Sequence, residues 1–100
     1  MNQRVLIEKN YLRIPIRKDA IEKNVWLYQE LTAVLQFQAG LFVDYGSGAP
    51  DFYAELPVER WKGSVLTFVH EEDRPVPFLQ SDELLPNTEP FQPWIHFAPK

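Results

Sequence analysis

Carboxylates are the residues of this sequence whose chemistry could support acid–base catalysis. Two carboxylates about 5–10 Å apart across a cleft can cleave a glycosidic bond. No acidic residue here lies in an apolar pattern that would desolvate it and raise its pKa, and neighbours within an acidic run point apart. We therefore predict that all of them are solvated surface groups and that this chain is not an enzyme. The acids considered are Asp44, Asp51, Glu55, Glu71-Glu72-Asp73 and Asp82-Glu83.

The two histidines, His70 and His96, do not indicate a metal site. Neither has a second histidine or a carboxylate at ligand spacing, and the absence of cysteine excludes disulfides and thiolate sites. We expect His70, which precedes an acidic run, to make surface salt bridges. We expect His96, between Ile95 and Phe97, to be a hydrogen-bonded structural residue. The sequence therefore predicts no metal and no cofactor.

Aromatic rings are the remaining candidates, because the CH groups of a sugar can pack on their faces. We predict Tyr53 and Trp61 as the best candidates for sugar contact, since both lie on the polar side of their local alternation. The alternative is that most rings fill the core or cover its rim, as large amphipathic rings ordinarily do. The rings considered are Trp26, Tyr28, Tyr45, Tyr53 and Trp61.

Alternating apolar and polar residues predict the elements that position these groups. The alternation is found in residues 11–16, 51–56 and 64–70, and it is typical of half-buried strands. Turn-forming stretches lie at 17–19, 46–50 and 61–63. Short strands at this spacing predict an all-β fold, a small antiparallel β-sandwich.

Residues 27–38 are compatible with either a helix or strands. Their leucines and Val34 have helical spacing, and no Gly or Pro interrupts 28–38. Several β-branched and aromatic residues of the same region favour strands instead. We predict two strands, at 24–29 and 33–38.

The C-terminal quarter has a different composition, because six of the nine prolines lie between Pro75 and Pro99. Proline excludes a helix or a central strand there, yet the stretch is rich in apolar side chains. We predict a β-sandwich domain over 1–74 and an extended segment over 75–100 that leads toward a missing catalytic domain. Without that domain, its exposed apolar strip should cause weak self-association. The side chains expected to dock are Phe91, Trp94, Ile95 and Phe97.

Length and charge bound the remaining possibilities. One hundred residues form one domain, and 45% hydrophobic residues suffice for a modest core. The net charge of −4 divides into +3 over residues 1–23 and −7 over the remainder. No cluster of basic residues follows a phosphate backbone, so we expect no nucleic-acid partner. No apolar run reaches the roughly 20 residues that span a bilayer, so we expect no membrane partner.

Several short motifs resemble, in their shared order, a known domain. They are GAPDFY at 48–53, RWKG at 60–63, VLTF at 65–68, QSDE at 80–83 and PFQPWIHFAPK at 90–100. This order resembles the small N-terminal domain that precedes the catalytic part of some bacterial enzymes of glycoside hydrolase family 32, among them levanases, inulinases and sucrose hydrolases.

The resemblance implies that the catalytic residues lie beyond Lys100, in a β-propeller that begins with the motif Trp-Met-Asn-Asp-Pro-Asn-Gly. This chain would then be a non-catalytic accessory module, with the propeller as its partner and fructan or sucrose as the substrate of the whole enzyme. Such an enzyme is expected to be extracellular or periplasmic. The alternatives are a carbohydrate-binding module that presents Tyr53 and Trp61 to fructan, and a self-standing enzyme.

Overall fold

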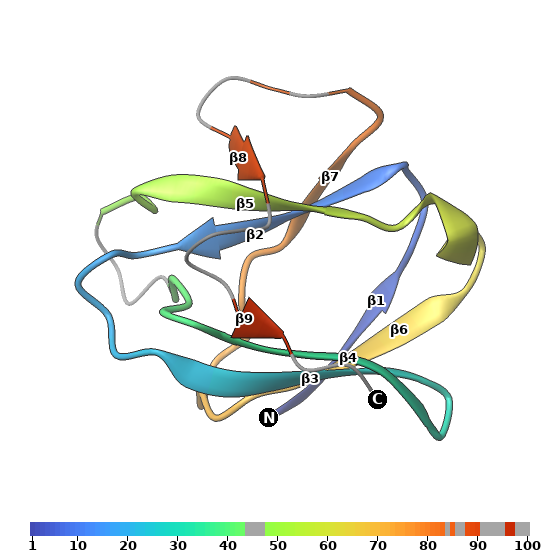
Figure 1. The fold of residues 1–100 in the computed structure, drawn as a ribbon, viewed down its shortest axis with the longest axis horizontal. Coiled ribbons are helices and arrows are strands. Elements are labelled where there is room, and N and C mark those ends of the chain that lie inside the picture. The colour runs from blue at the N-terminus through green and yellow to red at the C-terminus, as the bar shows by residue number, and fades with distance from the viewer. Residues whose placement is uncertain (44–47, 84, 86–87, 91–95, 98–100) are drawn as a thin grey trace.

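The computed structural model describes residues 1–43, 48–83 and 85, together with the strand backbones at 88–90 and 96–97. Two β-sheets stack face to face, one above the other in Figure 1, so the predicted all-β sandwich is confirmed. Helical structure among the described residues is limited to one 3-10 turn, η1 (Glu59–Trp61). None of it is long or apolar enough to cross a membrane.

The large sheet has five strands and the small sheet four. In spatial order, the large sheet consists of β1 (Asn2–Leu6), β6 (Val65–Val69), β3 (Lys23–Gln29), β4 (Thr32–Ala39) and β9 (His96–Phe97). The small sheet consists of β7 (Leu79–Ser81), β2 (Tyr11–Ile16), β5 (Phe52–Pro57) and β8 (Thr88–Pro90). Paired strands are antiparallel except β5 and β8, which run parallel. The strands predicted at 11–16, 51–56 and 64–70 form β2, β5 and β6.

The ambiguous region 27–38 forms the hairpin of β3 and β4, as predicted. Leu27 is fully buried whereas Leu31, four residues later, is 97% exposed at the hairpin tip, so the two do not share a helix face. Glu30 has a φ of 55°, the left-handed conformation of a tight hairpin turn. A register shift opposite Leu27 and Tyr28 makes Val34 an extra residue in β4. This bulge changes the alternation by one residue and explains the helix-like spacing.

One apolar core lies between the two sheets. Leu12 and Ile14 of β2 point into it from the small sheet, and Leu27 and Phe68 point into it from the large sheet. All four side chains have no exposed surface. Burying each contributes about 1.5–3 kcal/mol relative to exposure, so the alternation in the sequence directly fixes which face of each strand turns inward.

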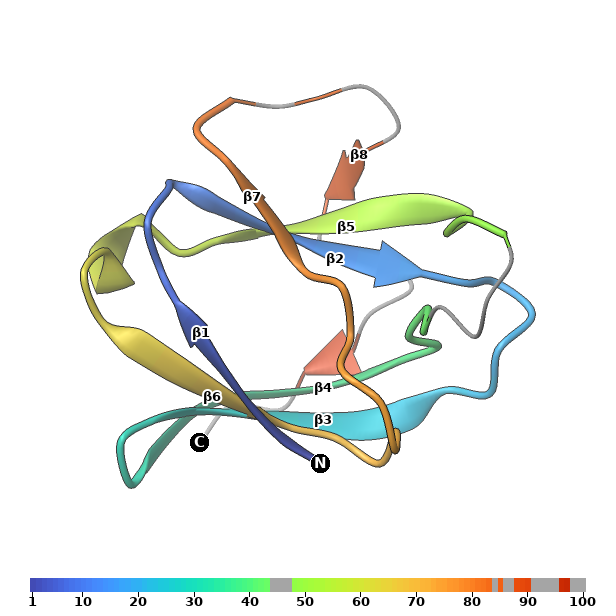
Figure 2. The same cartoon turned by 180° about the vertical axis from the view of Figure 1, so that it is seen from behind.

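The chain crosses between the sheets at their ends, as the two opposite views in Figures 1 and 2 show. After β2, the turn that contains Arg17 and Ala20 passes against Gly40, and the Arg17 N–H donates to the Gly40 carbonyl at 2.8 Å. A Cβ at position 40 would lie 2.8 Å from the carbonyl oxygens of both Arg17 and Ala20. Glycine therefore permits a close crossing that shapes this end of the sandwich.

Strands that follow residue 74 take part in both sheets. β7 pairs with β2, β8 pairs with β5, and β9 pairs with β4. A division at residue 74 thus does not separate the sheets from the described parts of 75–100. Three of the four expected docking residues, Phe91, Trp94 and Ile95, lie outside the described residues, and Phe97 belongs to β9.

Candidate functional site

Tyr53, one of the two predicted sugar contacts, lies on the outward face of β5. The guanidinium carbon of Arg13, on neighbouring β2, lies 4.2 Å from the centre of the Tyr53 ring. A cation over an aromatic face is attracted by the negative side of the ring quadrupole. One face of Tyr53 is therefore occupied by Arg13, and a sugar that stacked there would have to displace the guanidinium.

Arg13 also lies directly opposite Glu55 in the register of β2 and β5. Both residues are only 8% exposed, and within the described part of the chain Glu55 Oε2 is buried without a hydrogen-bond partner. Burial raises the pKa of Glu55, and the charge of Arg13 opposes that rise. The prediction that all carboxylates are solvated is thus wrong for Glu55. The reason is that β2 and β5 are the central strands of the small sheet, with a strand on either side of the pair.

Trp61, the other predicted sugar contact, ends the η1 turn after β5. It is partly buried against the core, and the guanidinium carbon of Arg60 lies 5.2 Å from the centre of its ring. Residues 54–60 separate Tyr53 from Trp61 in the chain. The first four of them, 54–57, belong to strand β5 and extend over about 13 Å. The two rings therefore do not form one platform for a sugar.

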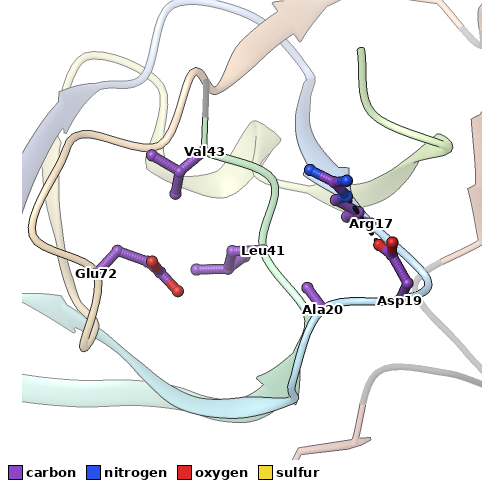
Figure 3. Close-up of a pocket in the computed structure, with 6 residues that line it drawn as sticks. All are labelled: Arg17, Asp19, Ala20, Leu41, Val43 and Glu72. Atoms are coloured by element: carbon purple, nitrogen blue, oxygen red, sulfur yellow. Dashed lines mark hydrogen bonds and ion pairs between the residues drawn. The ribbon is translucent and has the colours of Figure 1, made fainter. Parts of the chain in front are cut away.

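A shallow hollow of about 290 Å³ lies at the end of the sandwich where the turn after β2 meets the segment after β4. Figure 3 shows Leu41 and Val43 between Glu72 on one side and Arg17 and Asp19 on the other. An adjoining hollow of about 420 Å³ shares Arg17 and Asp19. The first hollow combines apolar walls with a charged rim, whereas charged residues form most of the lining of the second.

The charged groups around the hollows already pair with one another. Arg17 Nε lies 2.7 Å from Asp19 Oδ1, and Lys23 Nζ lies 3.6 Å from Glu72 Oε1. Surface pairs of this kind contribute about 0–1 kcal/mol each. No group of three His, Asp or Glu side chains suited to a metal ion forms in the described ranges. The described residues that line the hollows therefore form no metal-ligand set.

His70 does not make the surface salt bridge that its sequence context predicted. It is only 4% exposed, its Nε2 lies 3.0 Å from Gln3 Oε1, and its Nδ1 accepts the Glu72 N–H at 3.2 Å. Because Nδ1 accepts, Nε2 carries the proton and donates to Gln3. Burial, and then the charge of the N-terminal amine, lower the pKa of His70, while Glu72 acts in the opposite direction. His70 is thus a neutral structural residue.

Gln3 completes this structural role by binding the chain after β6 at the edge of the sandwich. Its Oε1 accepts the Val76 N–H at 2.8 Å and its Nε2 donates to the Val76 carbonyl at 2.7 Å. The side-chain amide thereby imitates one rung of a β-ladder. One of the two hydrogen-bond partners of His70, Gln3, lies 67 residues away in the sequence, which is why the local sequence pointed to a different role.

Two aromatic rings that the sequence did not favour share the outward face of the large sheet. Trp26 and Tyr28 alternate with the buried residues Val25 and Leu27 in β3 and are half-buried themselves. Trp26 lies between Val69 of β6 and Gln36 of β4 in the register. The signal was present in the sequence, since the strand alternation turns both rings outward, but their neighbours come from other strands.

Comparison of the chain with protein-family models, with curated proteins and with solved structures finds no match.

Proposed function

We propose that this chain is a non-catalytic accessory module of a glycoside hydrolase similar to family 32, an enzyme that acts on fructan or sucrose. The β-sandwich fold agrees with what the resemblance implies. The proposed partner is the catalytic β-propeller of the same polypeptide, and the proposed location is outside the cytoplasm. The module's task in this proposal is to pack against the propeller and stabilise it.

The observation that carries the proposal is the pairing of β9 with the large sheet. His96 and Phe97 lie opposite Gln38 and Phe37 of β4 in antiparallel register. These two residues belong to the segment 90–100 that most resembles the entry into a family 32 catalytic domain. A following domain attached through a strand of the sheet is held more rigidly than one attached through a free linker.

The described carboxylates support a non-catalytic role, because several of them hold turns of the fold. Asp51 accepts the Lys18 N–H at 2.7 Å, and Asp82 accepts the Asn10 N–H at 3.1 Å. Each of these carboxylates already accepts a hydrogen bond that holds a turn, so its position serves the fold.

The reading frame of the gene downstream of the Lys100 codon tests the proposal most simply. We expect it to continue into Trp-x-Asn-Asp-Pro-Asn-Gly. A stop codon directly after Lys100, or a continuation into an unrelated fold, would overturn the accessory-module proposal.

Activity measurements on the purified chain test the non-catalytic part. We expect no release of fructose from sucrose, levan or inulin, because Asp51 and Asp82 hold turns of the fold and Asp19 pairs with Arg17. Fructose release that is lost in Asp51→Asn or Asp82→Asn, with the fold retained, would contradict it.

A second function, carbohydrate binding, is favoured by the rings and amides on the outward face of the large sheet. The predicted contacts Tyr53 and Trp61 lie elsewhere, each with an arginine over its ring.

A further inference from the structure

The outward face of the large sheet is almost without charge. The register of β1, β6, β3 and β4 shows which side chains alternate with the buried ones. Of the outward residues in these four strands, Arg4 carries the one formal charge. A solvated sheet face usually carries charged side chains, and 24% of this chain is charged. The neutral composition of this face therefore calls for an explanation other than solvation.

Aromatic rings occupy the middle of this face. Trp26 and Tyr28 lie on the same side of β3, about 7 Å apart along the strand. Tyr28 lies opposite Thr67 of β6, and Trp26 lies opposite Val69. Both rings are half-buried, so part of each side chain remains exposed. Neither ring lies in the core cluster or in the group of side chains packed against it.

Side-chain amides flank the rings on the β4 side. Gln36 lies opposite Trp26, and Gln38 lies opposite Asn24. Gln38 Nε2 donates to Asn24 Oδ1 at 3.1 Å. This hydrogen bond orients the pair and leaves the Asn24 amide protons and the Gln38 carbonyl available, since an amide has two donor protons and an acceptor oxygen. The face thus combines apolar ring surface with neutral donors and acceptors.

We infer that this face, centred on Trp26, Tyr28 and Gln36, binds a neutral oligosaccharide. A sugar ring offers CH groups to an aromatic face and hydroxyl groups that both donate and accept hydrogen bonds, and it carries no charge. The rings and amides match those properties, and the near absence of charge matches a neutral ligand. The inference that the sugar is a fructan rests on the proposed function, whereas the ligand class rests on the face itself.

Contacts elsewhere in the molecule support this choice of site. The Tyr53 ring already has the Arg13 guanidinium 4.2 Å from its centre, so binding there must first displace a cation. Arg4, the charged residue on the outward face of these four strands, lies on β1, and two strands, β6 and β3, separate it from Gln36 on β4. A protein partner is the competing occupant. The amides of Gln36, Gln38 and Asn24 beside the rings favour the sugar, because its hydroxyl groups both donate and accept hydrogen bonds.

Chemical-shift mapping of the uniformly labelled chain tests the inference. The probes are short inulin-type and levan-type oligosaccharides, with cello-oligosaccharides for comparison. We expect concentration-dependent shifts of the Trp26 indole N–H and of the backbone amides of β3 and β4. The absence of shifts at all three sugars up to about 10 mM, weaker than roughly −3 kcal/mol of binding, would overturn the inference. Shifts confined to β2, β5 and η1 would also overturn it.

Three variants separate the site from its alternatives. Trp26→Ala should weaken binding at least about tenfold, a change of about 1.4 kcal/mol. Gln36→Ala, which removes an amide without touching the core, should weaken it measurably, and Trp61→Ala should leave it unchanged. The dispersion of the amide spectrum shows whether each variant is folded. If Trp26→Ala does not fold, the Gln36→Ala result decides.

The competing occupant and the proposed function have distinct outcomes. Dimerisation of the chain that depends on concentration and is lost in Gln36→Ala, without any sugar-dependent shift, would replace the sugar by a second copy and overturn the inference. Sugar binding at this face combined with a gene that stops after Lys100 would retain the inference and overturn the accessory-module proposal. A catalytic motif downstream of Lys100, combined with no sugar binding at this face, would retain the accessory-module proposal and overturn the inference.

Discussion

The outward faces of the two sheets differ in both charge and exposure. On the small sheet, Arg13 and Glu55 face each other and are each 8% exposed, with Tyr53 beneath the guanidinium. On the large sheet, Trp26 and Tyr28 are half-buried between neutral side chains. Charge is thus shielded on the small sheet, and aromatic surface is presented on the large sheet. Strand alternation shows that a residue points outward, but the neighbouring strands determine how much of it meets water.

The largest effect on stability is expected from a substitution on the outward face of the small sheet. Arg13→Ala should lower the free energy of unfolding by about 3 kcal/mol, because removal of one partner leaves the other charge buried and uncompensated. Urea denaturation measures it. The matched control is Arg4→Ala, an exposed arginine on the outward face of β1, which should change stability by no more than about 0.5 kcal/mol.

The double variant Arg13→Met with Glu55→Leu sharpens the same test. Apolar replacement of a whole buried pair is often neutral or stabilising, so this variant should regain most of the stability lost in Arg13→Ala. If Arg13→Ala lowers the free energy of unfolding no more than Arg4→Ala does, burial of charge does not distinguish the two faces.

The pH dependence of stability provides a second way to examine Glu55. Its folded-state pKa is raised above the ordinary value of 4.5, chiefly by burial. Between 4.5 and the raised pKa, the folded state holds a proton that the unfolded state has released. The free energy of unfolding should therefore decrease as the pH rises through this window. Denaturation midpoints of the wild type and of Glu55→Gln measure it, and an unchanged slope in Glu55→Gln would assign the effect to another group.

His70 should produce a slope of opposite sign. Its folded-state pKa is lowered below 6.5, so the unfolded state binds a proton that the folded state excludes. The contribution of His70 to the free energy of unfolding is then fully present above pH 6.5 and is lost as the pH falls through the lowered pKa. His70→Gln should remove this slope while that of Glu55 remains. A His70→Gln profile identical to that of the wild type below 6.5 would contradict the buried neutral assignment.

Much of the fold was predictable because strand alternation is a local property. Leu12 and Ile14 alternate with Arg13, and the pattern alone identified β2 and its inward face. The hairpin of β3 and β4 was harder to predict, because the bulge residue Val34 shifts the pattern by one. The local preference for strand in β-branched and aromatic residues nevertheless led to the right result.

The surroundings of individual side chains were not predictable in the same way. His70 was expected on the surface because Glu71 follows it, but its burial depends on Gln3, which lies 67 residues away. Glu55 was expected in water, but its burial depends on Arg13 in another strand. Pairs distant in the sequence are set by the register of the sheets, and a single sequence contains no direct record of that register.

A crossed comparison of two tyrosines is the most direct test of the difference between the faces. Tyr28→Ala and Tyr53→Ala each remove one half-buried ring, from the large and the small sheet respectively. Titration calorimetry with a fructan oligosaccharide, followed by urea denaturation of the same samples, measures binding and stability together. We predict that Tyr28→Ala loses at least about tenfold in affinity with little change in stability. We predict that Tyr53→Ala keeps its affinity and loses stability, because Arg13 loses its ring. Loss of affinity in Tyr53→Ala with retained affinity in Tyr28→Ala would contradict the account.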